Sequence, residues 1–193
     1  MTQEDPHQEF QPEPREEILT YAPFATSDEI GRFGKLLLRV TRNLALVGGL
    51  IFVGLVVMSL VSVVGRKLFS FAVPGDVEVL QMCAAFATST FFAYCHMIHG
   101  DIKVDFFTHN MAPNKIAFLD SIGSLTVGLF GALFSWRIAA GALSLKEVGE
   151  TSAILGWPVW IAQALMVPSF VLLAVAGFYM AVHQMRVAIW RSL

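Results

Sequence analysis

The residues with the most obvious chemical potential stand near the middle of the chain. His96, His99 and Asp101 have side chains that can bind a metal ion, and the two histidines are spaced to share one face of a helix. Two interpretations are open: a haem or metal site in the membrane anchor of a redox enzyme, or two interfacial histidines at a helix end. The second is favoured, because cofactors in helix bundles are usually held between facing helices, and the first and third apolar runs contain no histidine.

The two cysteines do not form a redox pair. Cys83 and Cys95 fall on the same expected helix, where twelve residues separate them by about 18 Å. A disulfide requires Cα atoms within about 7 Å. The chain also contains no Walker A, HExxH or GxSxG motif, and no basic patch interleaved with aromatic residues. The sequence therefore predicts a protein that is not an enzyme, with no cofactor and no nucleic-acid partner.

Four long apolar runs must position every polar residue of the chain. Apolar residues make up 55% of the sequence and charged residues 15%. A helix of about 20 apolar residues crosses the hydrocarbon core of a bilayer. The pattern predicts an all-α integral membrane protein, a bundle of four transmembrane helices within residues 44–193. The expected spans are 44–65, 79–98, 121–145 and 161–182.

Two different segments precede the first span. Residues 1–25 are rich in acids and prolines and are expected to be a disordered tail, because they cannot bury enough apolar surface to fold. Residues 26–43 have apolar and basic residues on different helical faces, which predicts an amphipathic helix lying on the membrane surface. An alternative is that the first span simply extends through this segment. The residues of the amphipathic helix expected to face the membrane surface are Arg32, Lys35, Arg39 and Arg42.

The basic residues also predict an orientation. Apart from Arg15 in the acidic tail, eight of them lie before the first span, between the second and third spans, or after the fourth, and three lie in the remaining connections. Cytoplasmic segments of membrane proteins carry an excess of Lys and Arg. Both termini are therefore expected in the cytoplasm. Arg66 and Lys67 fall on the opposite side, where Asp76 and Glu78 could neutralise them.

The third span contains two unusual features. Small residues recur every four positions, including Ser124, Gly128 and Ala132, and such stripes allow helices to pack closely in lipid. The stripe could serve packing within this chain or the helix of a partner. Arg137 interrupts the same span. In the expected orientation it lies near the outer end of the span, where it could extend to the interface or form an ion pair with Glu78 or Glu150. A charge within a span could also line a polar path, as in a small autonomous carrier or channel.

Several short motifs occur in an order that resembles a known family. Gly65-Arg66 ends the first span, Pro-Gly-Asp-Val-Glu78 opens the second, and Gly-Asp-Ile-Lys-Val-Asp105 follows it. Glu150-Thr-Ser, then Leu-Gly-Trp-Pro158 and Trp160, precede the fourth span. This pattern resembles the small permease subunit (DctQ-like) of tripartite ATP-independent periplasmic (TRAP) transporters. The resemblance covers about residues 35–190.

The resemblance implies a function that composition alone does not. Such subunits are scaffolds for a large permease subunit (DctM-like), which carries the substrate and ion sites, while a periplasmic binding protein (DctP-like) delivers an organic acid. By this analogy the chain would be a multi-pass protein of the bacterial inner membrane with no substrate site of its own. The structural or interface candidates are Arg66, Glu78, Asp105, Gly128, Arg137, Glu150 and Pro158.

Overall fold

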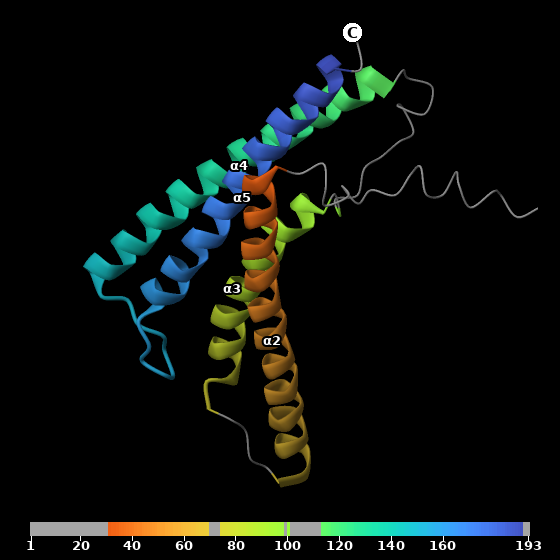
Figure 1. The fold of residues 1–193 in the computed structure, drawn as a ribbon. Coiled ribbons are helices and arrows are strands. Elements are labelled where there is room, and N and C mark those ends of the chain that lie inside the picture. Colours follow the sequence, from red (N-terminus) through yellow and green to blue (C-terminus); the bar gives the residue numbers. More distant parts are fainter. Residues whose placement is uncertain (1–30, 70–73, 99, 101–112, 191–193) are drawn as a thin grey trace, which may run out of the picture.

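A computed structural model of the chain describes residues 31–69, 74–98, 100 and 113–190, and these form four helices (Figure 1). Each helix is long and apolar enough to cross a membrane. They contain nearly all of the four predicted spans and extend beyond most of their ends, which confirms the all-helical class. The helices are α2 (Arg32–Phe69), α3 (Asp76–Met97), α4 (Pro113–Val148) and α5 (Val159–Trp190).

The prediction of a separate amphipathic helix at residues 26–43 is wrong. From Arg32 onward this segment is the first part of α2, which runs without interruption to Phe69. The physical reason lies in the sequence, because residues 35–47 contain neither proline nor glycine and nothing ends the helix near residue 43. The four basic side chains are exposed, but Leu37 and Thr41 between them are buried. Residues 26–30, and the predicted acidic tail, lie outside the described residues.

The helices pack in the order α2, α3, α5, α4. Helix α3 contacts α2 and α5, and α5 also contacts α4 along much of its length. Within the described part of the chain, α4 packs against α5 alone. Figure 1 shows α4 and α5 as an inclined pair that crosses the more upright α2 and α3. The expected bundle is thus an open one, in which α4 has a single helical neighbour.

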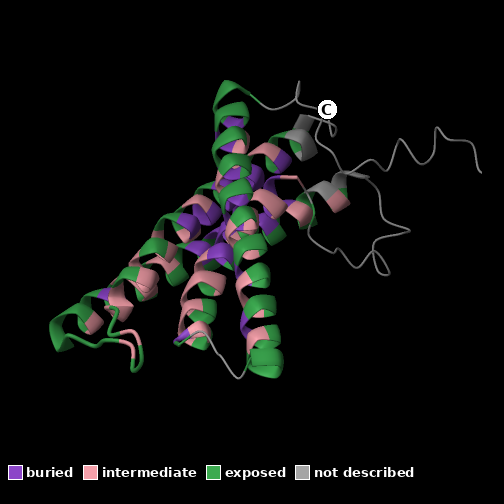
Figure 2. Cartoon of the chain, turned by 90° about the horizontal axis from the view of Figure 1, so that it is seen from below, coloured by how far each residue is buried: buried purple, intermediate pink, exposed green. Residues whose placement is uncertain are grey.

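The core lies where α2, α3 and α5 meet. Leu37 of α2, Met97 of α3, and Ala176 and Met180 of α5 form one buried cluster. Figure 2 shows the buried residues gathered around the helix crossings, with the helix ends and outer faces exposed. Exposed apolar side chains on the outer faces are expected for helices that face lipid tails, since lipid is as apolar as the side chains themselves.

Glycines set the closest approach between helices. A Cβ atom added at Gly48 of α2 would collide with the Thr90 hydroxyl of α3 and lie 2.9 Å from the Ala87 carbonyl oxygen. A Cβ at Gly177 of α5 would lie 2.5 Å from the backbone nitrogen of Gly128 in α4. The small residues of the third span therefore include positions that pack within this chain, against α5.

Buried polar side chains reinforce the contact between α4 and α5. The Ser121 hydroxyl donates to the Ala181 carbonyl oxygen at 2.8 Å. The Ser124 hydroxyl and the Gln184 Oε1 atom are also 2.8 Å apart. Hydrogen bonds between membrane helices contribute modest stability, about 0.6 kcal/mol on average. Their main effect here is to fix the register of the two helices.

Candidate functional site

The polar residues gather at the end of the molecule where α2 stops and α3 starts. Asp76, the first residue of α3, accepts hydrogen bonds from the Ser62 hydroxyl and from its neighbour's backbone, the Val77 N–H, at 2.8 Å. Arg66 forms an ion pair with the same carboxylate at 3.3 Å. Asp76 therefore ties the last turns of α2 to the first turn of α3. The ion pair between Arg66 and Asp76 agrees with part of the expectation from the sequence, whereas Glu78, the other expected partner of the Arg66–Lys67 pair, binds the α4–α5 loop instead.

Glu78 connects α3 to the loop between α4 and α5. One of its carboxylate oxygens accepts from the Ile154 N–H at 2.9 Å, and the other accepts from the Leu155 N–H at 3.1 Å. We call Ser62, Arg66, Asp76 and Glu78, together with the amides of Ile154 and Leu155, the polar clasp. It links segments that are more than 70 positions apart in the sequence and holds the start of α3 against the α4–α5 loop.

A glycine allows the loop to approach this closely. Gly75 precedes α3 with a φ angle of 75°, in the left-handed region that favours glycine. A Cβ atom at this position would lie 2.6 Å from Cγ of Leu155. Both the backbone conformation and the contact with Leu155 therefore require glycine at the start of α3.

The loop that joins α4 and α5 has an ordered backbone. Gly149 ends α4 at a φ of 70°, and its N–H donates to the Leu145 carbonyl oxygen at 3.1 Å, a glycine-dependent helix end. Ser152 then donates its N–H to the Trp157 carbonyl at 2.8 Å, and the Val159 N–H reaches the Glu150 carbonyl at 3.2 Å. The loop is thus held in a shape that presents its amides to Glu78.

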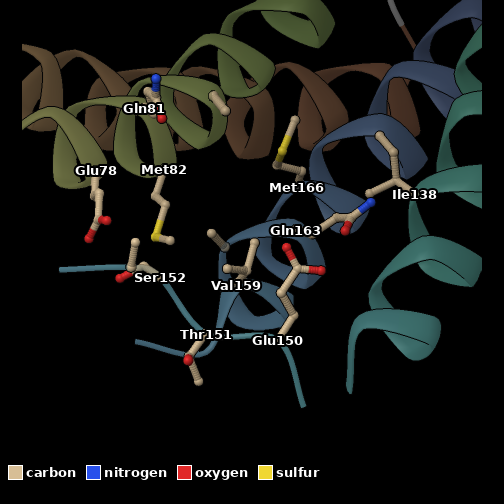
Figure 3. Close-up of a pocket in the computed structure, with 13 residues that line it drawn as sticks. Glu78, Gln81, Met82, Ile138, Glu150, Thr151, Ser152, Val159, Gln163 and Met166 are labelled. Carbon is tan, nitrogen blue, oxygen red and sulfur yellow. The ribbon is translucent and has the colours of Figure 1, made fainter. Parts of the chain in front are cut away.

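A pocket of about 600 Å³ opens next to the clasp, between α3, α4 and α5 (Figure 3). Its walls combine methionines with polar groups, and Figure 3 shows the Glu150 carboxylate and the Gln163 amide on the same side. The lining contains two carboxylates and no lysine or arginine, so its charge does not suit an anionic organic acid. The lining residues are Glu78, Gln81, Met82, Ala85, Ile138, Glu150, Thr151, Ser152, Ala153, Val159, Ala162, Gln163 and Met166.

The structure separates Arg137 from its expected partners. Glu78 is bound to the loop amides, Glu150 points toward the pocket, and Arg137 is exposed on α4 with no ion pair to a described residue. Gly128 lies at the α4–α5 crossing, and Pro158 immediately precedes α5. Asp105 lies outside the described residues.

The described residues do not form the metal site considered for His96, His99 and Asp101. His96 is buried near the end of α3, whereas His99 and Asp101 lie outside the described residues. Across the described parts of the chain, no group of three or more His, Cys, Asp or Glu side chains is placed to hold a metal ion. Cys83 and Cys95 are both free thiols.

Comparison with protein families distinguishes a transporter subunit from the membrane anchor of a redox enzyme. Residues 55–187, from the middle of α2 to near the end of α5, match the family model described as "Tripartite ATP-independent periplasmic transporters, DctQ component". The chain belongs to this family. Searches of curated proteins and of solved structures returned no match. The DctQ component is a multi-pass membrane subunit, and its family implies a tripartite transporter with DctM- and DctP-type components rather than an enzyme.

Sequence reasoning missed several residues that organise this DctQ component. Gly177 was not singled out, although Gly177 and Ala181 have the same four-residue spacing as the small residues of the stripe in the third span. The role of Glu78 in holding Ile154 and Leu155 was also missed. No local signal could have revealed it, because the acceptor and the donors belong to distant segments that only the fold brings together.

Proposed function

We propose that this DctQ component is the scaffold subunit of a TRAP-type secondary transporter. It binds a large DctM-like permease and holds it in the bilayer during ion-coupled uptake of an organic acid, such as a C4-dicarboxylate. A DctP-like periplasmic protein delivers this substrate. The family match over residues 55–187 carries the proposal.

The geometry supports a scaffold rather than a carrier. The polar side chains of the clasp bind one another and the backbone of the α4–α5 loop. The pocket beside them is lined by carboxylates, which would repel an organic acid. Substrate and ion sites are therefore assigned to the large permease, and this chain is assigned none.

The candidate residues take roles that follow from their positions. Arg66 and Glu78 brace the helix ends within the polar clasp, and Gly128 allows α4 to approach α5. Pro158 starts α5 after the ordered loop, and Glu150 contributes its carbonyl oxygen to that loop. Asp105 is proposed as an interface residue from the sequence pattern alone.

A pull-down tests the proposed function. The tagged chain should be purified in mild detergent from its native membranes, and its companions identified by mass spectrometry. We expect a stoichiometric, much larger polytopic permease to accompany it. A chain that purifies alone, or together with redox enzymes, would contradict the proposal.

We further propose that the protein lies in the bacterial inner membrane with both termini in the cytoplasm. This orientation places the polar clasp and the α4–α5 loop at the periplasmic side. The exposed bases at the start of α2, Arg32, Lys35, Arg39 and Arg42, are its main determinants.

Charge reversal at the start of α2 tests this orientation. Replacing Arg32, Lys35, Arg39 and Arg42 together with glutamate should impair insertion or invert the topology, because the cytoplasmic excess of positive charge is lost. Reporter fusions at the C-terminus, active on only one side of the membrane, measure the outcome. The same fusion on the unaltered chain is the reference, and unchanged insertion and orientation of the variant would refute the assignment.

A further inference from the structure

One charged side chain of α4 lies within an apolar, membrane-length helix and has no ion-pair partner among the described residues. Arg137 stands eleven positions before Val148, where α4 ends, which is about 17 Å along the helix axis. Its side chain is exposed, and it forms no ion pair or hydrogen bond with the described residues. A charged side chain that is exposed to hydrocarbon without a partner is energetically unfavourable.

The surroundings of Arg137 make its exposure to lipid alone unfavourable. The neighbouring side chains Leu133, Phe134 and Trp136 are apolar and exposed. The next base along α4 is Lys146, which lies over the ring of Trp160. Lys146 is about 14 Å further along the helix, a distance greater than the length of an arginine side chain. The Arg137 side chain therefore cannot extend to the level of the Lys146–Trp160 contact.

Helical periodicity defines the face to which Arg137 belongs. Gly128, Gly131 and Ala142 of α4 are buried on the side that packs against α5. At 100° per residue, Leu133, Arg137, Ala140 and Ser144 lie together on the opposite side. All four are exposed. We call these four residues the Arg137 face; it points away from the one helix that α4 contacts in the described structure.

We propose that the Arg137 face binds a membrane helix of the large permease, and that Arg137 pairs there with an aspartate or glutamate of that helix. The inference rests on the proposed function, which supplies the permease as the partner. A carboxylate is the required chemistry, because the guanidinium group donates two parallel hydrogen bonds to it and the pair cancels both charges.

The other residues of the Arg137 face suit a helix as the occupant. Ala140 and Ser144 are small and recur at four-residue spacing, which permits close approach of a second helix. Leu133 adds an apolar contact on the other side of the charge, and is 57% exposed in the isolated chain. The face therefore combines one charge that needs neutralising with a surface that a helix can cover.

The effect of Arg137→Leu on association with the permease shows whether Arg137 faces a permease carboxylate or lipid. If lipid surrounds the side chain, removing the charge should leave the complex unchanged. If a permease carboxylate pairs with it, the substitution leaves that carboxylate buried and uncompensated, which strongly weakens association. In both cases the isolated chain should fold normally, since Arg137 forms no ion pair or hydrogen bond with the residues that the structure describes.

Co-purification measures this effect. The chain carrying Arg137→Leu is co-expressed with its permease and compared with the unaltered chain and with Lys67→Leu, which removes an exposed base at the end of α2. We expect permease recovery to fall by at least about tenfold in the first variant alone. Equal recovery in all three would overturn the inference while leaving the proposed function intact. Failure of the unaltered chain to recover the permease would overturn both.

A second measurement does not depend on the variant's folding. A photo-crosslinking amino acid placed at Leu133 keeps Arg137 in position and samples the same face. We expect a covalent product with the permease. Products with lipid only, in a complex that otherwise purifies intact, would overturn the inference.

Discussion

Gly177→Leu is expected to separate α4 from α5 and to destabilise the whole chain. The first side-chain carbon would lie 2.5 Å from the Gly128 nitrogen, 2.6 Å from its Cα and 2.9 Å from the Ser124 carbonyl oxygen. All three are backbone atoms, so no side-chain rotation can relieve the overlap. Overpacking of this kind costs about 3 kcal/mol. The thermal unfolding midpoint of the purified chain in detergent should fall clearly.

A matched control exists on the opposing helix. Gly123 of α4 has no atom within 4 Å of its added Cβ, so Gly123→Leu makes the same chemical change in open space. We expect this variant to unfold at nearly the same temperature as the unaltered chain. Equal effects of the two substitutions would show that helix propensity or hydrophobicity, rather than the crossing of α4 and α5, determines stability.

Gly128→Leu provides a further test from the other side of the crossing. An added Cβ at Gly128 would lie 3.0 Å from the Phe178 nitrogen, a less severe contact than at Gly177. We therefore expect a smaller loss of stability than for Gly177→Leu, measured in the same unfolding experiment. A larger loss at Gly128 would contradict the described geometry.

The membrane spans were predictable because the physics that creates them is local. A bilayer requires about 20 apolar residues per crossing and satisfied backbone hydrogen bonds, and both conditions can be checked in a single segment. The prediction of a separate surface helix at the start of α2 was wrong for a related reason. Exposed bases and apolar residues alternate there as in a surface helix, but Leu37 is buried in the core beside Met97 and Met180. Local periodicity does not reveal which element covers an apolar face.

The polar clasp required the tertiary structure. The sequence placed Asp76 and Glu78 together in the first turn of a helix, where the helix dipole favours acids. It offered no means of knowing that Glu78 would meet the amides of Ile154 and Leu155. Arg137 is the opposite case. The sequence suggested Glu78 and Glu150 as its ion-pair partners, but in the fold Glu78 binds loop amides and Glu150 lines the pocket.

Glu78→Ala is expected to release the α4–α5 loop from α3. Among the described residues, α3 and α4 do not pack against each other, so the carboxylate of Glu78 is a direct link between the two helix pairs at this end. Loss of a charged acceptor leaves the Ile154 and Leu155 amides without their partner. Amide hydrogen exchange at these two residues should become at least about tenfold faster, because local opening no longer breaks two hydrogen bonds.

Two comparisons give this prediction its specificity. Glu147→Ala removes another exposed acid, at the end of α4, and should leave exchange at Ile154 and Leu155 unchanged. Arg66→Ala removes the exposed ion pair with Asp76, whose contribution should be small because solvent screens it. If exchange stays slow in Glu78→Ala, the loop is held by its own backbone hydrogen bonds instead. If it rises, a single carboxylate at the start of α3 fixes the loop that joins α4 and α5.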